Sequence, residues 1–212
     1  MDERFRGVFD MNKFNVRPPP QLPALLAAVA EVGFDMSCTA ETGHFLRFLA
    51  ATKTGCRALE IGTGAGVGTA WLLDGMDATS TLLTIDPDEA VSGLARKHLA
   101  GDPRVTFLND DAGRVLRGSR LGPFDLIFAD AGPGKYELVS ETIALLAPGG
   151  IYVVDDMLPQ PDWPSEHYLL ASAMVDRMAA LCAAEPVTSV GVHWSTGLMM
   201  LTRQADAHRR PT

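Results

Sequence analysis

Short apolar runs alternate with longer amphipathic stretches along most of the chain. The apolar runs are rich in branched residues and end at glycines or acids, which is typical of strands. We expect strands at 57–61, 81–85, 105–108, 124–129 and 151–154. Helices are expected near 66–75, 88–100, 111–118, 135–147 and 165–183. Apolar strands that alternate with helices indicate an α/β fold, in which a doubly wound parallel sheet is covered on both faces.

The pattern changes toward both ends of the chain. Two further helices are expected at about 21–33 and 39–53, after a proline-rich stretch that ends at Pro20. Near the carboxyl end, strands at 187–193 and 198–202 flank a short glycine-containing turn, which predicts an antiparallel hairpin at the end of the sheet. We therefore divide the chain into an amino-terminal arm (1–20), one domain (21–203) and a polar tail (204–212).

Composition limits the classes of function. The chain has 212 residues, 47% of them hydrophobic, with 18 Lys+Arg against 26 Asp+Glu and a formal net charge of -8. The length and the hydrophobic content suit a single folded domain. The acidic balance disfavours nucleic acid as a partner, because phosphates must be neutralised by Lys and Arg. Nucleic acid is therefore not an expected partner.

The sequence also bears on the cellular compartment. It contains no apolar run long enough for a transmembrane helix, and its first residues lack the basic start of a signal peptide, so no membrane partner is expected. Cys38, Cys56 and Cys182 are odd in number and widely spaced, which favours free thiols in a reducing compartment. We therefore expect a cytoplasmic protein.

A glycine-rich turn follows the first expected strand, in the run from Glu60 to Thr69. Glycines at a strand-to-helix turn let the backbone approach a ligand closely. The dinucleotide fingerprint G-x-G-x-x-G fails here, because Val67 or Thr69 stands where its third glycine belongs. The run reads Glu-x-Gly-x-Gly-x-Gly, which resembles motif I of class I S-adenosylmethionine-dependent methyltransferases. A turn with only packing value is the alternative.

Acids follow the next two strands. Asp86 ends the second strand, where a carboxylate can accept two hydrogen bonds from a ribose diol. A helix cap at this point is equally good chemistry, and both roles can hold at once. The run from Asn109 to Ala112 resembles the loop that borders the adenine in methyltransferases, with Asp111 favoured over Asp110 by register. A helix cap is again the alternative.

Three more acids are expected at the carboxyl edge of the sheet. Asp130 ends the fourth strand, and Asp155 and Asp156 end the fifth, so that adjacent parallel strands bring the three carboxylates together. Such a cluster repels itself unless a cation relieves it, and Mg²⁺ prefers oxygen ligands. We therefore expect a metal at this cluster. The alternative is that one acid holds the substrate or the ammonium group of the cofactor, with no metal.

The stretch from about 35 to 203 resembles the cation-dependent O-methyltransferases of the catechol and caffeoyl-coenzyme A type. The matching pieces are Leu59–Gly62, Ile85–Asp86, Phe124–Asp130, Tyr136, and Pro148–Gly150 leading to Val154–Asp156. Upstream, Met36–Ser37 and Glu41–Gly43 are similar to the part of that family that closes over the cofactor.

The resemblance implies a Rossmann-like sheet of seven strands with an antiparallel last strand, and a homodimer. It implies S-adenosylmethionine as the cofactor, a divalent cation such as Mg²⁺, and methyl transfer to a hydroxyl of a small phenolic or catechol-like acceptor. The residues it assigns to the cofactor are Met36, Ser37, Glu60, Gly62, Thr63, Gly64, Gly68, Asp86, Asp111, Ala112 and Asp130.

The sequence departs from this family at two positions. Asp156 stands where the family usually has asparagine, which adds a negative charge to the cluster. Pro133 stands where the family has its catalytic lysine. Lys135 lies two residues later, and either Lys135 or an acid of the cluster such as Asp130 is expected to take the proton of the acceptor. The alternative for Lys135 is an ordinary surface lysine at a helix start.

Two residues beyond the cluster bear on the acceptor. Trp163 ends a proline-rich loop and is interpreted either as a wall of the acceptor site or as a buried residue of a connection. His167 is better explained as a residue on a helix surface. Two other functions compete with the main hypothesis: a metal-independent methyltransferase of the same fold acting on another nucleophile, and a nicotinamide-dependent oxidoreductase, which the failed fingerprint disfavours.

Overall fold

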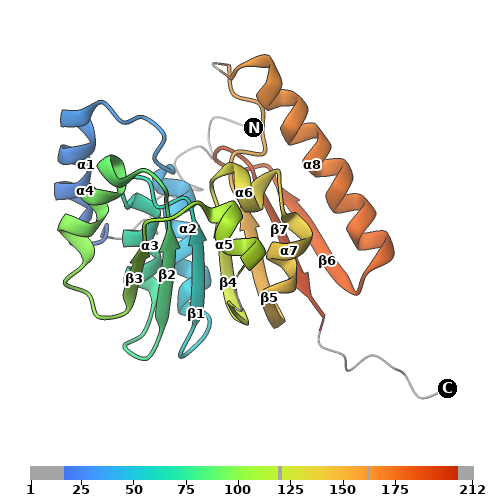
Figure 1. Ribbon diagram of the computed structural model, residues 1–212, viewed down its shortest axis with the longest axis horizontal. Coiled ribbons are helices and arrows are strands. Elements are labelled where there is room, and N and C mark those ends of the chain that lie inside the picture. The colour runs from blue at the N-terminus through green and yellow to red at the C-terminus, as the bar shows by residue number, and fades with distance from the viewer. Residues whose placement is uncertain (1–16, 119–120, 162, 205–212) are drawn as a thin grey trace, which may run out of the picture.

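The computed structural model describes residues 17–118, 121–161 and 163–204. Within them, seven strands form one sheet in the order β3-β2-β1-β4-β5-β7-β6 (Figure 1). The strands are β1 (Arg57–Ile61), β2 (Thr81–Ile85), β3 (Val105–Leu108), β4 (Phe124–Ala129), β5 (Leu146–Val154), β6 (Val187–Val192) and β7 (Leu198–Arg203). The helices are α1 (Leu22–Val32), α2 (Ala40–Ala51), α3 (Val67–Gly75), α4 (Glu89–Leu99), α5 (Ala112–Gly118), α6 (Gly132–Lys135), α7 (Val139–Ala144) and α8 (Ser165–Ala184).

The topology confirms the doubly wound sheet expected from the sequence. Strands β1 to β5 are parallel to one another, whereas β7 pairs antiparallel with both β5 and β6. The chain runs outward from β1 to β3 and then returns to β4 on the other side of β1. This reversal is a topological switch point, and in open α/β sheets ligands bind beyond the carboxyl ends of the strands at such a point.

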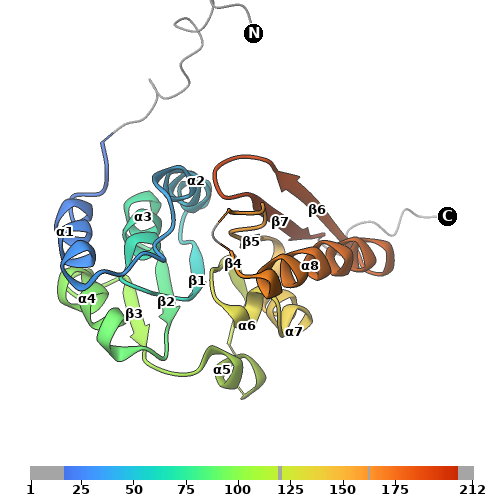
Figure 2. The same cartoon turned by 90° about the horizontal axis from the view of Figure 1, so that it is seen from above.

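Two apolar cores fill the space between the sheet and its helices. One core joins α1 to α4 to one face of the sheet, and the other joins α5, α7 and α8 to the opposite face. Viewed from above, α2 and α3 lie on one side of the sheet and α7 and α8 on the other (Figure 2).

The stretch between β4 and β5 differs from the expected single helix at 135–147. Two short helices, α6 and α7, occupy it, and strand β5 already begins at Leu146. The helical path is interrupted at Gly134, which has φ 82, and at Leu138, which has φ 55. Left-handed backbone at these two residues cannot continue an α-helix. The register of β5 against β4 also shifts between Phe124 and Leu126, because Pro148–Gly150 bulges out of the pairing.

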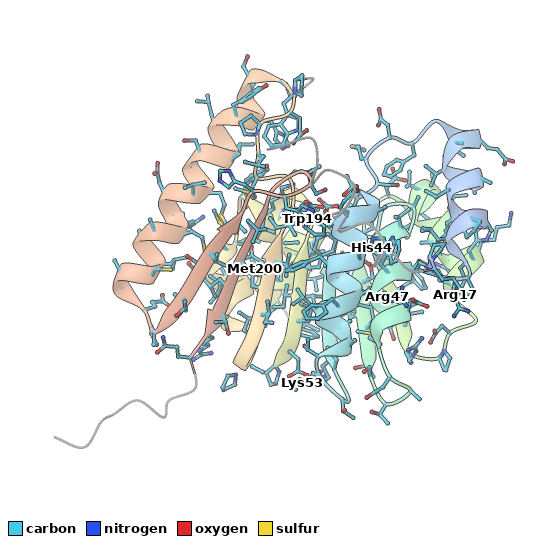
Figure 3. All side chains as sticks on the ribbon, turned by 180° about the vertical axis from the view of Figure 1, so that it is seen from behind. Arg17, His44, Arg47, Lys53, Trp194 and Met200 are labelled. Carbon is cyan, nitrogen blue, oxygen red and sulfur yellow. The ribbon has the colours of Figure 1, made fainter. Side chains whose placement is uncertain are left out.

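The expected arm and tail fall mostly outside the described residues, namely at 1–16 and 205–212. The described part of the arm is held on α2, where the Arg47 Nη1 donates to the backbone oxygen of Arg17 over 3.0 Å. Both residues are labelled in Figure 3, which looks onto α2. Among residues 17–118, 121–161 and 163–204, no helix has the length and apolar character needed to cross a membrane.

Candidate active site

A pocket of about 360 Å³ opens at the switch point, beside the carboxyl ends of β1, β2 and β4. Nine of the eleven residues expected to hold the cofactor line it. They are Met36, Ser37, Glu60, Gly62, Thr63, Gly64, Gly68, Asp86 and Asp130. The structure thus brings together residues from the segment before α2, the glycine-rich turn and the ends of two further strands.

The glycine-rich turn needs its glycines for two separate reasons. Gly66 has φ 91, and a Cβ there would lie 2.6 Å from the Cβ of Ala95 on α4. Gly68 has ordinary backbone, but a Cβ on it would lie 2.6 Å from the Glu60 Oε1 atom inside the pocket. The first glycine therefore lets the turn pack against α4, and the second keeps the pocket open.

Glu60, at the end of β1, lines the pocket and has a buried carboxylate oxygen without a partner in the described part of the chain. Its side chain is 1% exposed, and its Oε2 accepts hydrogen bonds from the hydroxyls of Thr69 and Thr84. Its Oε1 has no partner among the described residues. Burial raises the pKa of Glu60 to about 7, although the two threonine bonds oppose the shift. A buried oxygen without a donor is costly, so this atom marks a place for a ligand's N–H group.

Asp86 positions the glycine-rich turn and also borders the pocket. Its Oδ2 accepts from the Gly64 amide over 2.8 Å, and its Oδ1 accepts from the Asp88 amide over 2.9 Å. The cap of α4 is Asp88, whose carboxylate accepts from the amides of Ala90 and Val91. The cap that the sequence allowed at Asp86 therefore belongs to Asp88, and each Asp86 oxygen keeps a lone pair for a ribose hydroxyl.

Asp111 and Ala112 are the two expected cofactor residues that do not line the pocket. The Asp111 Oδ1 accepts from the Arg114 amide over 2.7 Å at the start of α5, which is the helix-cap alternative. Asp110 pairs with the Arg114 guanidinium at the surface. A contact between Asp111 and an adenine stays a prediction.

The pocket also contains residues that the sequence did not single out. Four of them are Phe34 and Cys38 beside the expected cofactor-closing segment, Val91 on α4, and Phe128 on β4. Phe34 and Cys38 flank Met36 and Ser37 in the sequence, so proximity could have indicated them. Val91 and Phe128 reach the pocket only through the three-dimensional packing. Burial raises the pKa of the Cys38 thiol well above its usual value, and neighbouring acids add to the shift, so Cys38 stays protonated.

The acid cluster encloses a lysine. Lys135 is 4% exposed, and its Nζ lies 3.6 Å from the Asp130 Oδ1 and 3.2 Å from the Asp156 Oδ2. Burial lowers the pKa of Lys135, but the carboxylates of Asp130 and Asp156 outweigh it and the net shift is upward. Burial raises the pKa of Asp130 well above its usual range, and Lys135 opposes that shift. The burial rules out the surface-lysine alternative.

Asp155 serves the architecture of the site. Its side chain is 1% exposed, and its Oδ1 accepts from the Thr196 hydroxyl over 2.6 Å, the Asp156 amide over 2.8 Å and the Thr42 hydroxyl over 3.4 Å. It therefore connects the end of β5 to α2 and to the turn between β6 and β7. Burial is the main reason that the pKa of Asp155 is raised.

The donor set does not fit the metal expected at Asp130, Asp155 and Asp156. Among the described ranges, no group of three or more histidine, cysteine or acidic side chains is arranged to hold a metal ion. The Asp155 Oδ1 is engaged by three protein donors, and the other two carboxylates face the Lys135 ammonium. The sequence placed these acids at one edge correctly, but it did not show that a lysine lies between two of them.

Aromatic side chains border the lysine. The Tyr136 hydroxyl lies 2.8 Å from the His167 Nε2, and the rings of Trp163 and His167 are 4.3 Å apart. The Lys135 Nζ lies 5.5 Å from the centre of the Tyr136 ring. His167 is thus a member of an aromatic group next to the acid cluster, where the sequence favoured an isolated helix-surface residue. Trp163 belongs to the same aromatic group. Its role as a wall of the acceptor site stays a prediction.

Known proteins resemble this chain in sequence and in fold. A family described as a methyltransferase domain matches residues 59–157. A protein of Mycobacterium avium, provisionally named as an O-methyltransferase, is 37% identical over 139 residues, covering 62% of this chain and 63% of that protein. A similarly named protein of Mycolicibacterium vanbaalenii is 36% identical over 140 residues, covering 62% of each. The chain thus spans less than two thirds of the length of these curated relatives.

Solved structures share the whole fold. A Klebsiella pneumoniae protein, also provisionally named as an O-methyltransferase, is 26% identical with a TM-score of 0.77, over 92% of this chain and 94% of that one. The O-methyltransferase TomG of Streptomyces achromogenes, solved with S-adenosylmethionine, is 24% identical with a TM-score of 0.77, over 97% of this chain and 100% of that one. Residues 59–157 are therefore similar to a methyltransferase domain, and the whole chain shares its fold with these solved proteins.

Proposed function

We propose that the protein is an S-adenosylmethionine-dependent O-methyltransferase, acting on a hydroxyl of a small phenolic or catechol-like acceptor. The observation that carries the proposal is the unpaired, buried Glu60 Oε1 in a pocket built by the glycine-rich turn. An amino-acid ammonium group is the donor that such an oxygen lacks. The named relatives support the reaction class, and TomG supports the cofactor because it was solved with S-adenosylmethionine.

The residues present suit the amino-acid and ribose parts of this cofactor. Glu60 would accept from its ammonium group, the glycine-rich turn would lie against its middle, and Asp86 would accept from its ribose. The bound cofactor would supply a methyl group on a positively charged sulfur. Glu60, Asp86 and Asp130 all border the pocket. The pocket is therefore rich in acidic groups, which complement the positive charges of the ligand.

Residues of the chain itself would ionise the acceptor hydroxyl and orient the acceptor ring. The Lys135 ammonium lies in the acid cluster beside Asp130, which also borders the cofactor pocket. A positive charge there favours the ionised form of an acceptor hydroxyl, whose proton would pass to a carboxylate of the cluster or to water. Tyr136 lies beside the same lysine, and His167 and then Trp163 extend this aromatic group, which suits a planar phenolic ring.

Other parts of the sequence-based hypothesis remain predictions. The proposal contains no step that uses a divalent cation, because the three acids expected to hold one are engaged by protein groups. The homodimer, the cytoplasmic location and the absence of nucleic-acid partners are expectations from the sequence or from the family resemblance. The alternative of a methyltransferase acting on another nucleophile differs from the proposal only in the acceptor.

A transfer assay tests the proposal. The protein is incubated with methyl-labelled S-adenosylmethionine and a panel of catechols and simple phenols, with matched aromatic amines and thiols in parallel. We expect label in O-methyl products, identified by mass spectrometry, and none with the Gly68→Ala variant, whose new methyl group would enter the pocket. Label confined to amine or thiol acceptors would contradict the O-methyltransferase assignment.

A further inference from the structure

We infer that the Lys135 ammonium is the built-in cation of the acid cluster, so that the site works without a divalent metal ion. The inference rests on the proposed function, since it concerns the same site. It identifies Lys135 as the group that stabilises negative charge on the acceptor oxygen during methyl transfer. The acid cluster is then complete as the chain folds, rather than after it has taken up an ion.

The backbone around Lys135 is fixed against the sheet. The Tyr152 hydroxyl donates to the Gly134 carbonyl, and the Gly134 amide donates to the Glu137 carbonyl over 2.7 Å. A Cβ on Gly134 would lie 2.6 Å from the Ile61 Cδ1, so the loop packs directly on β1. Lys135 therefore leaves a rigid support, and its side chain reaches the cluster because the loop is anchored beneath it.

The ammonium occupies the point on which the two available carboxylates converge. Asp130 comes from the end of β4 and Asp156 from the end of β5, and both turn an oxygen toward the same Nζ at 3.6 and 3.2 Å. A metal ion held by these two oxygens would need the volume that the Nζ fills, and Mg²⁺ tolerates little departure from octahedral geometry. The Oδ1 of Asp155 already accepts from three protein donors, so this oxygen is committed to the framework.

Asp156 is held in the conformation that this pairing requires. Its φ of 53 is left-handed, which is uncommon for a residue with a side chain and persists only where the surroundings determine it. Its amide donates to the Asp155 Oδ1, so the turn at the end of β5 is closed by the neighbouring acid. At the end of β5, Asp155 therefore binds groups of the surrounding backbone and threonines, whereas Asp156 pairs with Lys135.

Another acid–lysine pair provides the contrast. Lys53 also pairs with an aspartate, Asp125, but its side chain is 51% exposed and the pair lies at the opposite, amino-terminal end of the strands. Such surface pairs contribute little, because water screens them. The Lys53→Met variant is therefore a matched control for Lys135→Met, since it removes the same charge outside the site.

A cation titration tests the inference without any acceptor. Mn²⁺, as a substitute for Mg²⁺, is titrated by calorimetry into the wild type, Lys53→Met, Lys135→Met and the double variant Lys135→Met with Asp156→Gly, because glycine accepts the left-handed backbone at this position and carries no ligand atom. We expect no binding to the wild type or to Lys53→Met, one new site in Lys135→Met, and loss of that site in the double variant. Stoichiometric Mn²⁺ binding to the wild type, or a Lys135→Met variant that binds no Mn²⁺, would overturn the inference.

Activity provides the second readout, with the acceptor identified in the transfer assay. We expect full activity in excess chelator, a loss of roughly 100-fold in Lys135→Met, as for removal of an oxyanion-stabilising group, and partial retention in Lys135→Arg. S-adenosylmethionine binding to the same variants controls for folding and should be unchanged. Activity that falls on chelation would contradict the inference, whereas a wild type that binds no S-adenosylmethionine would contradict only the proposed function.

Discussion

Glu60 combines two opposed requirements at the scale of a single residue. Its carboxyl is buried, which favours the neutral form, yet one oxygen lacks a donor and faces the pocket, which favours a cationic ligand. In the protein without ligand, burial dominates and raises the pKa of Glu60 to about 7. Two measurable consequences follow, one for cofactor binding and one for stability.

Cofactor affinity should depend on pH through Glu60. A cationic ammonium group binds better to the ionised carboxylate, and Glu60 ionises as the pH rises through its pKa of about 7. We predict that S-adenosylmethionine affinity in the wild type rises between about pH 5.5 and 7, where the ligand's own α-amino group stays mostly protonated. In Glu60→Gln it should be flat and about tenfold or more weaker at pH 7.5. Calorimetry across this range measures both, and a pH-dependent Glu60→Gln would contradict the assignment.

Stability should depend on pH with the opposite sign. The folded-state pKa of Glu60 is raised from 4.5 to about 7, so the fold holds this proton more tightly than the unfolded chain. Its contribution is therefore largest below about pH 4.5 and is lost as the pH rises to about 7. At pH 8, the free energy of unfolding of Glu60→Gln should exceed that of the wild type by up to about 3 kcal/mol. The variant should therefore also unfold at a higher temperature. A lower melting temperature for the variant at pH 8 would contradict this reasoning.

The turn between β1 and α3 decides ligand access at the scale of an element. Gly68→Ala should abolish S-adenosylmethionine binding, because the added carbon would lie 2.6 Å from the Glu60 Oε1. Gly93→Ala, in α4, is the matched control, since a Cβ there meets nothing within 4 Å. We expect the control to bind normally and to be more stable by about 0.5–1 kcal/mol, as alanine is the better helix former. Binding assays and thermal melts of both variants provide the comparison.

The elements that the sequence could predict are those with strong local patterns. The five apolar runs ending at Ile61, Ile85, Leu108, Ala129 and Val154 all became parallel-sheet strands, and the turn at 194–197 joined the antiparallel pair. The stretch at 135–147 could not be predicted, because left-handed backbone at Gly134 and Leu138 leaves no trace in hydrophobic periodicity. The glycine-rich turn, by contrast, was visible from its composition alone.

The same limit applies to the site. The sequence placed Asp130, Asp155 and Asp156 at one sheet edge, since strand ends follow from the apolar pattern. It could not distinguish their functions, because the donors that engage Asp155 come from Thr42 and Thr196, which are far away in the chain. Likewise, Lys135 reaches the cluster only through the loop packing, which residue spacing does not encode.

Asp155 connects separate parts of the whole molecule. It joins the end of β5 to α2 and to the turn between β6 and β7, and it is buried. We predict that Asp155→Ala lowers the free energy of unfolding by about 2–4 kcal/mol, because it leaves buried donors unpaired. Asp110→Ala, which removes a surface pair with Arg114, should change it far less, because water screens that pair. Chemical denaturation of both variants tests this, and equal effects would contradict the role of Asp155.

At the scale of the whole molecule, part of the excess negative charge lies around one pocket. The excess of acids, 26 Asp+Glu against 18 Lys+Arg, includes Glu60, Asp86 and Asp130 around one pocket. A cationic cofactor would meet its opposite charge there, and a buried lysine balances the adjoining acid cluster. Fold, pocket and charge therefore agree on a single site at the switch point of the sheet.

The central claim is that this pocket binds S-adenosylmethionine. Isothermal titration calorimetry of the full chain with S-adenosylmethionine at pH 7.5, repeated with NAD, tests it most directly. The account predicts one equivalent of S-adenosylmethionine bound per chain, competition by S-adenosylhomocysteine, and no heat with NAD. Absence of S-adenosylmethionine binding by folded protein, or preferential binding of NAD, would contradict it.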